Sequence, residues 1–138
     1  MKDAYISTDP KLLDIDLIHQ YLTNAYWAKG RTKAEVVQSI DNSLCFGIYL
    51  DQQQIGFTRV LTDYVVFGYV MDVFILPEYR GKGYSKLLLK TIFDHHDLQQ
   101  IQRWMLATKD AHGLYQQFGF NAIPNPSVLM GKLNIKTA

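Results

Sequence analysis

Hydrophobic positions in the N-terminal third of the chain recur with a helical period. From Asp9-Pro10 to Leu22 the spacing predicts a first helix, with the proline in its opening turn. A short strand over residues 4–7 is expected before it. Thr32 to Glu35 has the pattern of a capping box, in which two side chains satisfy free backbone groups at a helix start. A second helix should therefore begin there and end near residues 41–42.

The pattern then changes to a period of two. Residues 44–50 alternate as a half-buried strand does, and residues 55–61 are expected to return beside them after a turn. Residues 67–76 are apolar on both faces apart from Asp72. A strand of that kind is typical of the middle of a sheet with both faces covered. Two helices followed by strands thus predict a mixed α/β domain.

The stretch PEYRGKGYSKLLLKTIF places glycines where the next helix must begin. Its apolar stripe is expected at Tyr84, Leu87, Leu88 and Ile92. The first turn of a helix leaves backbone N–H groups free, and its dipole favours an anion there. Glycines let a ligand approach the backbone closely. The stretch therefore predicts a phosphate site, although a tight turn without a ligand has the same composition. Its spacing fits neither the nucleotide-triphosphate loop nor the dinucleotide fingerprint.

Composition limits the classes of protein to which the chain can belong. The 138 residues suit one domain, 1–138, with 48% hydrophobic and 20% charged residues. A net charge of +1 weakly disfavours a nucleic-acid binder. Cys45 is the only cysteine, so a disulfide within the chain is excluded and a reducing compartment is expected. No apolar run is long enough to span a bilayer and no secretory signal opens the chain, which predicts a cytoplasmic protein without membrane partners.

Two motifs resemble those of the GCN5-related N-acetyltransferase (GNAT) family. Arg80-x-x-Gly83-x-Ser85, after the strand around Val73, is similar to the family's acetyl-CoA motif, with serine where the family has glycine or alanine. Residues 111–120 look like the family's later helix and turn, which end in Tyr-x-x-x-Gly-Phe. The two motifs stand in the family's order, and the resemblance covers nearly the whole chain.

The resemblance implies a twisted mixed sheet of six or seven strands with helices on both faces. Two central parallel strands would splay apart to admit the pantetheine arm of acetyl-CoA, the cosubstrate. Residues 101–107 would form the second of these strands and residues 128–133 the last strand of the sheet. The residues expected to bind acetyl-CoA are Val73, Phe74, Ile75, Arg80, Gly81, Lys82, Gly83, Tyr84 and Ser85.

Acetyl transfer by direct attack of an amine needs an acid near the sulfur and a route for the amine proton. Tyr115 matches the family position that often carries such a tyrosine, although it could be a core aromatic. Asp72 could serve as the base or bind a cationic amine, or it could form a buried ion pair with Arg59. His112, one turn before Tyr115, could touch the thioester region or face solvent.

The acceptor pocket is expected between the first two helices, at Tyr26, Trp27 and Arg31, with Arg59 as a further candidate. A plain hydrophobic junction would also explain Trp27. The function expected first is acetylation of a small-molecule amine. Acetylation of a protein or peptide amine and a noncatalytic acyl-CoA sensor are the alternatives, and Tyr115 argues against the sensor. No metal is expected, and a homodimer is a common assembly among proteins that look like this.

Overall fold

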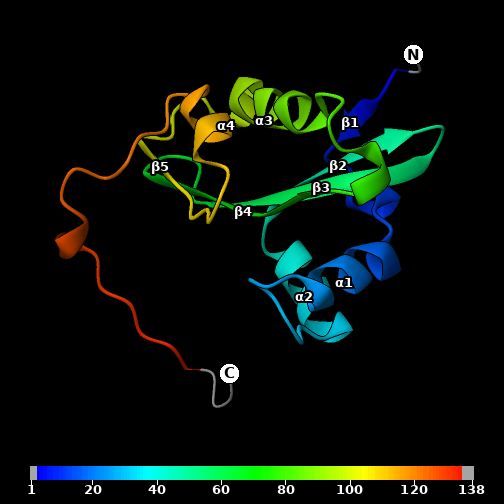
Figure 1. Ribbon diagram of the computed structural model, residues 1–138, viewed down its shortest axis with the longest axis horizontal. Coiled ribbons are helices and arrows are strands. Elements are labelled where there is room, and N and C mark those ends of the chain that lie inside the picture. The colour runs from blue at the N-terminus through cyan, green and yellow to red at the C-terminus, as the bar shows by residue number, and fades with distance from the viewer. Residues whose placement is uncertain (1–2, 135–138) are drawn as a thin grey trace.

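A five-stranded mixed sheet forms the centre of the molecule (Figure 1). The structure, a computed structural model, describes residues 3–134. The strands lie in chain order and are β1 (Tyr5–Ser7), β2 (Leu44–Leu50), β3 (Gln53–Thr62), β4 (Phe67–Ile75) and β5 (Arg103–Met105). The pairs β1–β2, β2–β3 and β3–β4 are antiparallel, whereas β5 pairs parallel to β4. The α/β class and the central place of β4 are confirmed.

Helices cover both faces of the sheet. Helices α1 (Ile15–Asn24) and α2 (Lys33–Asp41) lie on one face, and α3 (Tyr84–Asp94) and the short α4 (His112–Gln116) lie on the other (Figure 1). Each face has its own buried cluster, one around Ile18 and Val36 and the other around Leu88 and Ile92. Of the helices within residues 3–134, none has the length and apolar character that a bilayer crossing requires.

The N-terminal helix prediction was correct in type but wrong in its start. Residues Pro10–Leu12 form a separate 3-10 turn, and α1 begins only at Ile15. Two aspartates cause the interruption, because the carboxylates of Asp9 and Asp14 each accept a backbone N–H and start a turn of their own. The capping box at Thr32 and Glu35 is confirmed, with both reciprocal hydrogen bonds present.

Helix α3 buries a slightly different stripe from the one expected. Leu87 is 39% exposed, and Leu89 is buried in its place beside Leu88. The stripe stays continuous because residues 88, 89 and 92 lie on one face of the helix, together with Tyr84.

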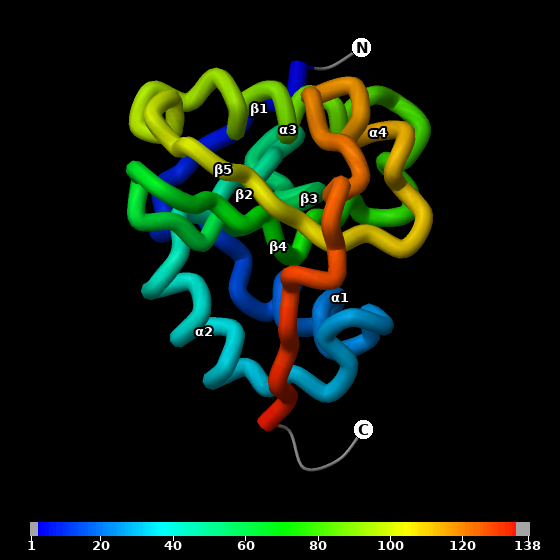
Figure 2. The backbone as a smooth tube through the Cα atoms, turned by 90° about the vertical axis from the view of Figure 1, so that its left-hand side faces the viewer, coloured from blue at the N-terminus to red at the C-terminus, as the bar shows by residue number. Residues whose placement is uncertain are grey.

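The prediction of six or seven strands was wrong, since within residues 3–134 the sheet has five. The second splayed strand is confined to Arg103–Met105, and residues 128–133 form no strand. The chain instead makes a 3-10 turn at Pro126–Val128 and continues without regular structure to residue 134. Figure 2 shows this segment descending from α4 without joining the sheet.

Two buried groups make the fold sensitive to alkali. Burial raises the pKa of the Cys45 thiol and of the Tyr49 hydroxyl to about 12 in each case. Within residues 3–134 the buried Tyr49 hydroxyl also has no hydrogen-bond partner. Since both groups hold their protons more tightly in the folded state, their contribution to stability is complete below their ordinary pKa values and is lost as pH rises toward about 12.

We therefore expect the free energy of unfolding to fall as pH rises above about 9, where these thiols and phenols begin to titrate in the unfolded chain. Tyr49→Phe removes one of the two groups and a buried hydroxyl without a partner. The variant should be as stable as the parent at pH 7 or more stable by up to about 1 kcal/mol, and it should lose less stability as pH rises. Urea unfolding from pH 7 to 11 measures both effects. Tyr64→Phe, at an exposed tyrosine, is the control; equal alkaline slopes for all three proteins would contradict the prediction.

Candidate active site

The two parallel strands of the sheet separate soon after they begin to pair. Strand β5 pairs with β4 only at Phe67, Gly68 and Tyr69. Beyond Tyr69 and as far as Ile75, no strand formed by residues 3–134 lies on the side of β4 that faces away from β3. The splayed strands expected from the family resemblance are therefore present, and they leave a row of backbone groups of β4 facing open space.

A pocket of about 660 Å³ lies in this gap. One wall is residues 69–75 of β4, and the opposite wall is formed by residues that follow β5 and by the start of α4. Its ends lie at the N-terminus of α3 and at the connection between α1 and α2. The lining side chains from these parts include Tyr21, Tyr26, Trp27, Tyr69, Arg80, Ser85, Thr108, Asp110 and Tyr115.

The loop before α3 has the features of an anion site. Gly81 and Gly83 have φ values of 78° and 86°, in the left-handed region that favours glycine. A Cβ atom added at either position would meet nothing within 4 Å, so the space in front of this backbone is open. Gly83 caps α3 without a side-chain hydrogen bond, and the first bond within the helix comes from Leu87 N–H. The N–H groups of residues 84–86 therefore remain available to a ligand.

Arg80 fixes this loop to the rest of the site. Its Nε donates to the carbonyl of Ile75 at 3.0 Å, and its Nη2 donates to the hydroxyl of Tyr21 at 2.7 Å. Tyr21 in turn stacks on Phe74, with ring centroids 4.0 Å apart. The guanidinium thus keeps its positive charge beside the pocket and ties the loop to the end of β4 and to α1.

Asp72 occupies a bulge in the middle of β4. Pairing with β3 is regular at Phe57 and again at Arg59, but β4 has one more residue than β3 between these points. Asp72 takes a φ of 55° there, which aspartate tolerates better than most residues. The bulge turns its side chain toward the face covered by α1 and α2.

The carboxylate of Asp72 is buried and accepts three hydrogen bonds from two segments. Trp27 Nε1 donates to Oδ1 at 2.9 Å, and Arg31 Nη1 donates to Oδ2 at 2.7 Å, both from the connection after α1. Arg59 Nε on β3 donates to Oδ2 at 2.6 Å. Arg59 also donates to the hydroxyl of Ser43. The ion pair with Arg59 that sequence reasoning left open is confirmed, and Arg31 adds a second cation to it.

This arrangement separates the expected substrate-binding residues into two groups. Tyr26, Trp27 and Asp72 line the pocket. Arg31 and Arg59 bind the carboxylate of Asp72 and, within residues 3–134, are not among the residues that line the pocket. With both oxygens occupied, Asp72 positions Trp27 in the pocket wall. Its role as a base remains a prediction without support from this geometry.

Tyr115 lies where a proton donor would be needed. Its side chain is buried and lines the pocket opposite β4. Burial raises the pKa of its hydroxyl, so the group stays protonated at neutral pH. Its ring makes an edge-to-face contact with Phe120. A protonated phenol facing the gap can donate to a ligand there.

The remaining candidates are less central. His112 begins α4 and lines a neighbouring groove that it shares with Tyr115, but it does not line the pocket itself. Of the other predicted binding residues, residues 73–75, Arg80 and Ser85 line the pocket; Tyr84 is buried in the core beneath the loop. Within residues 3–134, no three His, Cys, Asp or Glu side chains form a metal-binding group.

The predicted site residues did not include several side chains of the pocket, among them Tyr21, Tyr69 and Asp110. Tyr21 was assigned to the apolar stripe of the first helix, and Tyr69 to a strand buried on both faces. Asp110, in the loop before α4, is an exposed carboxylate that lines the pocket. Its position between a strand and a helix motif was the only available signal, and such a loop aspartate is equally common as a helix cap.

Comparisons with known proteins agree on one family. The family model described as the acetyltransferase (GNAT) family matches residues 13–120. A protein of Gibberella zeae whose name places it among the acetyltransferases is 32% identical, and the match covers 82% of this chain and 76% of that protein.

Solved structures show the same fold. A Xanthomonas campestris pv. campestris protein described as belonging to the GNAT family is 48% identical, with a TM-score of 0.93 over 96% of this chain and 94% of that one. A Clostridium acetobutylicum protein solved with acetyl-CoA has a TM-score of 0.68 at 16% identity, over 97% of this chain and 96% of that one. At that identity the likeness concerns the fold alone.

The Asp72 cluster predicts a large effect on stability from a small change. Asp72→Asn keeps the size of the side chain but leaves the buried guanidinium of Arg59 without a negative partner. Removing one partner of a buried pair typically costs about 3–5 kcal/mol, so we expect a loss of that order in urea unfolding. Asp94→Asn removes an exposed carboxylate from its pair with Lys90 and should cost about 0.5 kcal/mol or less. Similar losses in the two variants would show that the cluster is not a structural anchor.

Proposed function

The chain belongs to the acetyltransferase (GNAT) family, and we propose that it transfers an acetyl group from acetyl-CoA to the primary amine of a small molecule, by direct attack of the amine. One observation carries the proposal. The gap between β4 and β5 runs from an uncapped helix N-terminus to the hydroxyl of Tyr115. A single pocket thus offers an anion site at one end and a proton donor at the other.

The residues present fit acetyl-CoA. Free N–H groups at the start of α3, together with Arg80 and Lys82, suit a pyrophosphate. The unpaired edge of β4 around Val73 and Ile75 suits the amides of a pantetheine arm, which would add to the sheet as a strand does. When bound, acetyl-CoA supplies a thioester as the acyl donor. The Clostridium acetobutylicum protein with the same fold, solved with acetyl-CoA, supports this reading.

Direct attack is supported by the position and the pKa of the one cysteine. Cys45 is the only cysteine, lies outside the pocket lining, and has a pKa raised to about 12 by burial. It therefore carries almost no thiolate at neutral pH. In the proposed step the amine nitrogen bonds to the acyl carbon, the carbon–sulfur bond breaks, the amine gives up a proton to water, and the departing thiolate takes one from the hydroxyl of Tyr115.

The walls of the pocket favour a small amine as the acceptor. The rings of Tyr26 and Trp27 pack edge to face at the end of the pocket nearest α1, with their centroids 5.2 Å apart. Asp110 places a carboxylate on the opposite wall. Aromatic faces and a carboxylate both attract a protonated amine. The volume of about 660 Å³ is also within the range of sites for small molecules.

The anion site predicts opposite effects of one substitution on folding and on binding. Ser85 lies in the first turn of α3 and lines the pocket. Ser85→Asp should stabilise the helix slightly, because a negative charge is favourable at a helix N-terminus. The same charge should repel the pyrophosphate and weaken acetyl-CoA binding by at least about tenfold in calorimetry. Ser85→Ala is the matched control, and its affinity for acetyl-CoA should change by less than about tenfold. An aspartate variant that is folded and binds normally would place the pyrophosphate elsewhere.

Tyr115→Phe tests the proton donor. The change removes the hydroxyl and keeps the ring, so melting temperature should change little. Turnover should fall by about 10²–10⁴-fold, the usual contribution of general acid catalysis, while acetyl-CoA affinity changes by less than about tenfold. Because the pKa of Tyr115 is raised, loss of its proton should not lower the turnover of the parent protein below about pH 10.

The assay is release of free thiol from acetyl-CoA with a panel of amines that includes polyamines, aromatic amines and lysine-containing peptides. Faster turnover with peptides than with any small amine would contradict the proposed acceptor class. Binding of acetyl-CoA without thiol release for every amine would contradict acetyl transfer. A Phe variant as active as the parent would remove Tyr115 from the mechanism without affecting either conclusion.

A further inference from the structure

A lysine side chain reaches across the acceptor end of the pocket. Lys109 lies in the loop between β5 and α4, where its neighbours Thr108 and Asp110 line the pocket. Its Nζ atom lies 5.2 Å from the ring centroid of Tyr26, which lines the pocket from the connection after α1. This cation–π contact joins the two segments. Because both side chains are exposed, the contact lies at the rim that faces solvent.

The two partners of this contact are not held equally. The ring of Tyr26 packs edge to face against Trp27, and Trp27 Nε1 donates to the buried carboxylate of Asp72. Tyr26 therefore rests against a side chain that is anchored to the sheet. Lys109 is exposed and carries its charge at the end of a flexible four-carbon chain. The ammonium of Lys109 is thus the partner that can leave, while the ring stays in place.

The ring that Lys109 covers lies close to the proposed proton donor. Burial raises the pKa of the Tyr115 hydroxyl, and the phenol of Tyr26 on the same pocket adds to this shift. A cation held on the ring of Tyr26 is therefore near the place where the acyl group would be transferred. In the structure, a cation of the chain itself occupies that ring.

We propose that Lys109 is a specificity-determining residue that competes with protonated acceptors for the ring of Tyr26. Two ammonium groups repel each other at such short range, so a charged acceptor must displace Lys109 before it can use the ring. A neutral amine enters without displacing it. Lys109 therefore shifts the preference of the site toward weakly basic amines, such as those attached to an aromatic ring. The inference rests on the acetyl transfer proposed above and adds which small amines are favoured.

Cyclohexylamine and aniline are matched probes, because each carries one primary amine on a six-membered ring and only cyclohexylamine is protonated at neutral pH. Lys109→Met keeps an unbranched side chain and removes the charge. An exposed cation–π contact is weak, so kcat/KM for cyclohexylamine should rise by about two- to fivefold in the thiol-release assay, mainly through a lower KM. The value for aniline should change by less than about 1.5-fold. Lys109→Arg keeps the charge and should behave like the parent protein.

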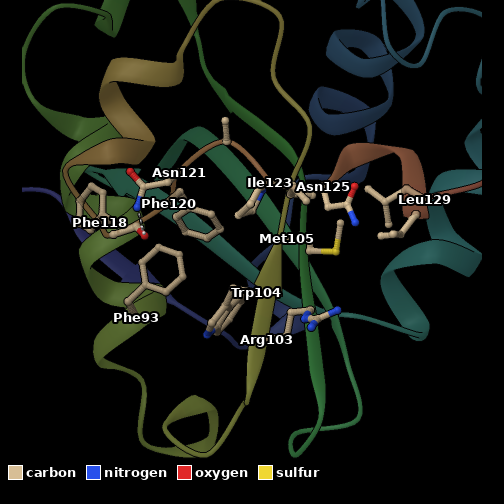
Figure 3. Close-up of a pocket in the computed structure, with 14 residues that line it drawn as sticks. Phe93, Arg103, Trp104, Met105, Phe118, Phe120, Asn121, Ile123, Asn125 and Leu129 are labelled. Carbon is tan, nitrogen blue, oxygen red and sulfur yellow. Dashed lines mark hydrogen bonds between the residues drawn. The ribbon is translucent and has the colours of Figure 1, made fainter.

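Arg103→Met is the control for the loss of one positive charge. Arg103 is exposed and lines a separate groove between β5 and the chain that follows α4, together with Trp104 and Phe120 (Figure 3). Both probes should react with this variant as they do with the parent protein. Equal gains in Lys109→Met and Arg103→Met would assign the effect to net charge, and equal gains for the two amines would assign it to easier entry. Either result would overturn the proposal.

A second measurement follows Lys109 directly and needs no turnover. A proton above an aromatic ring resonates upfield, so the ε-CH₂ signal of Lys109 should lie upfield of the other lysine signals in ¹H–¹³C NMR spectra. Its absence from the spectrum of Lys109→Met identifies it. In protein saturated with free CoA, which has no acetyl group to give, cyclohexylamine should move this signal to the ordinary lysine position and aniline should not.

The two measurements separate this inference from the proposed function. A Lys109 signal at the ordinary position from the start, or one that cyclohexylamine does not move, would overturn the competition even if small amines are acetylated. Displacement of Lys109 by cyclohexylamine, without thiol release for any amine, would contradict acetyl transfer and still support the competition.

Discussion

The fold and the pocket depend on one buried carboxylate. Asp72 binds Trp27 and Arg31 from the connection after α1, and Arg59 from the neighbouring strand. Burial of a charge is costly unless it is fully paired, so the arrangement is stable only when all three donors are in place. The bulge in β4 is what turns the carboxylate toward them. A single side chain thereby joins the sheet, the helical layer and the aromatic wall of the pocket.

Several parts of this structure could be predicted because their signals are local. The capping box at Thr32 and the glycine turn before α3 involve residues within one turn of each other, and both were found as expected. The anomaly of a carboxylate in a buried strand was visible, and so was Arg59 as its partner. Arg31 and Trp27 could not be identified as further partners, because the bulge that brings them within reach has no signature in the sequence.

The edge of the sheet was predicted least well, for a related reason. Residues 101–107 and 128–133 both have the composition of strands, yet strand formation needs a neighbour to supply hydrogen bonds. Within residues 3–134 β5 has that neighbour on one side only, and residues 128–133 have none. A sequence pattern states which residues favour a strand, whereas pairing decides how many of them adopt it.

The two halves of the pocket are built from different kinds of atoms. The half beside α3 and β4 offers mainly backbone N–H and C=O groups, whose positions depend on the fold and on two glycines more than on which side chains surround them. The half beside α1 offers the rings of Tyr21, Tyr26 and Trp27. Divergence can therefore replace most residues around the backbone half while its chemistry persists, which is consistent with a shared fold at 16% identity. In the aromatic half, each replacement changes the shape of the surface that a substrate contacts. New specificities can therefore arise there without changes in the rest of the domain.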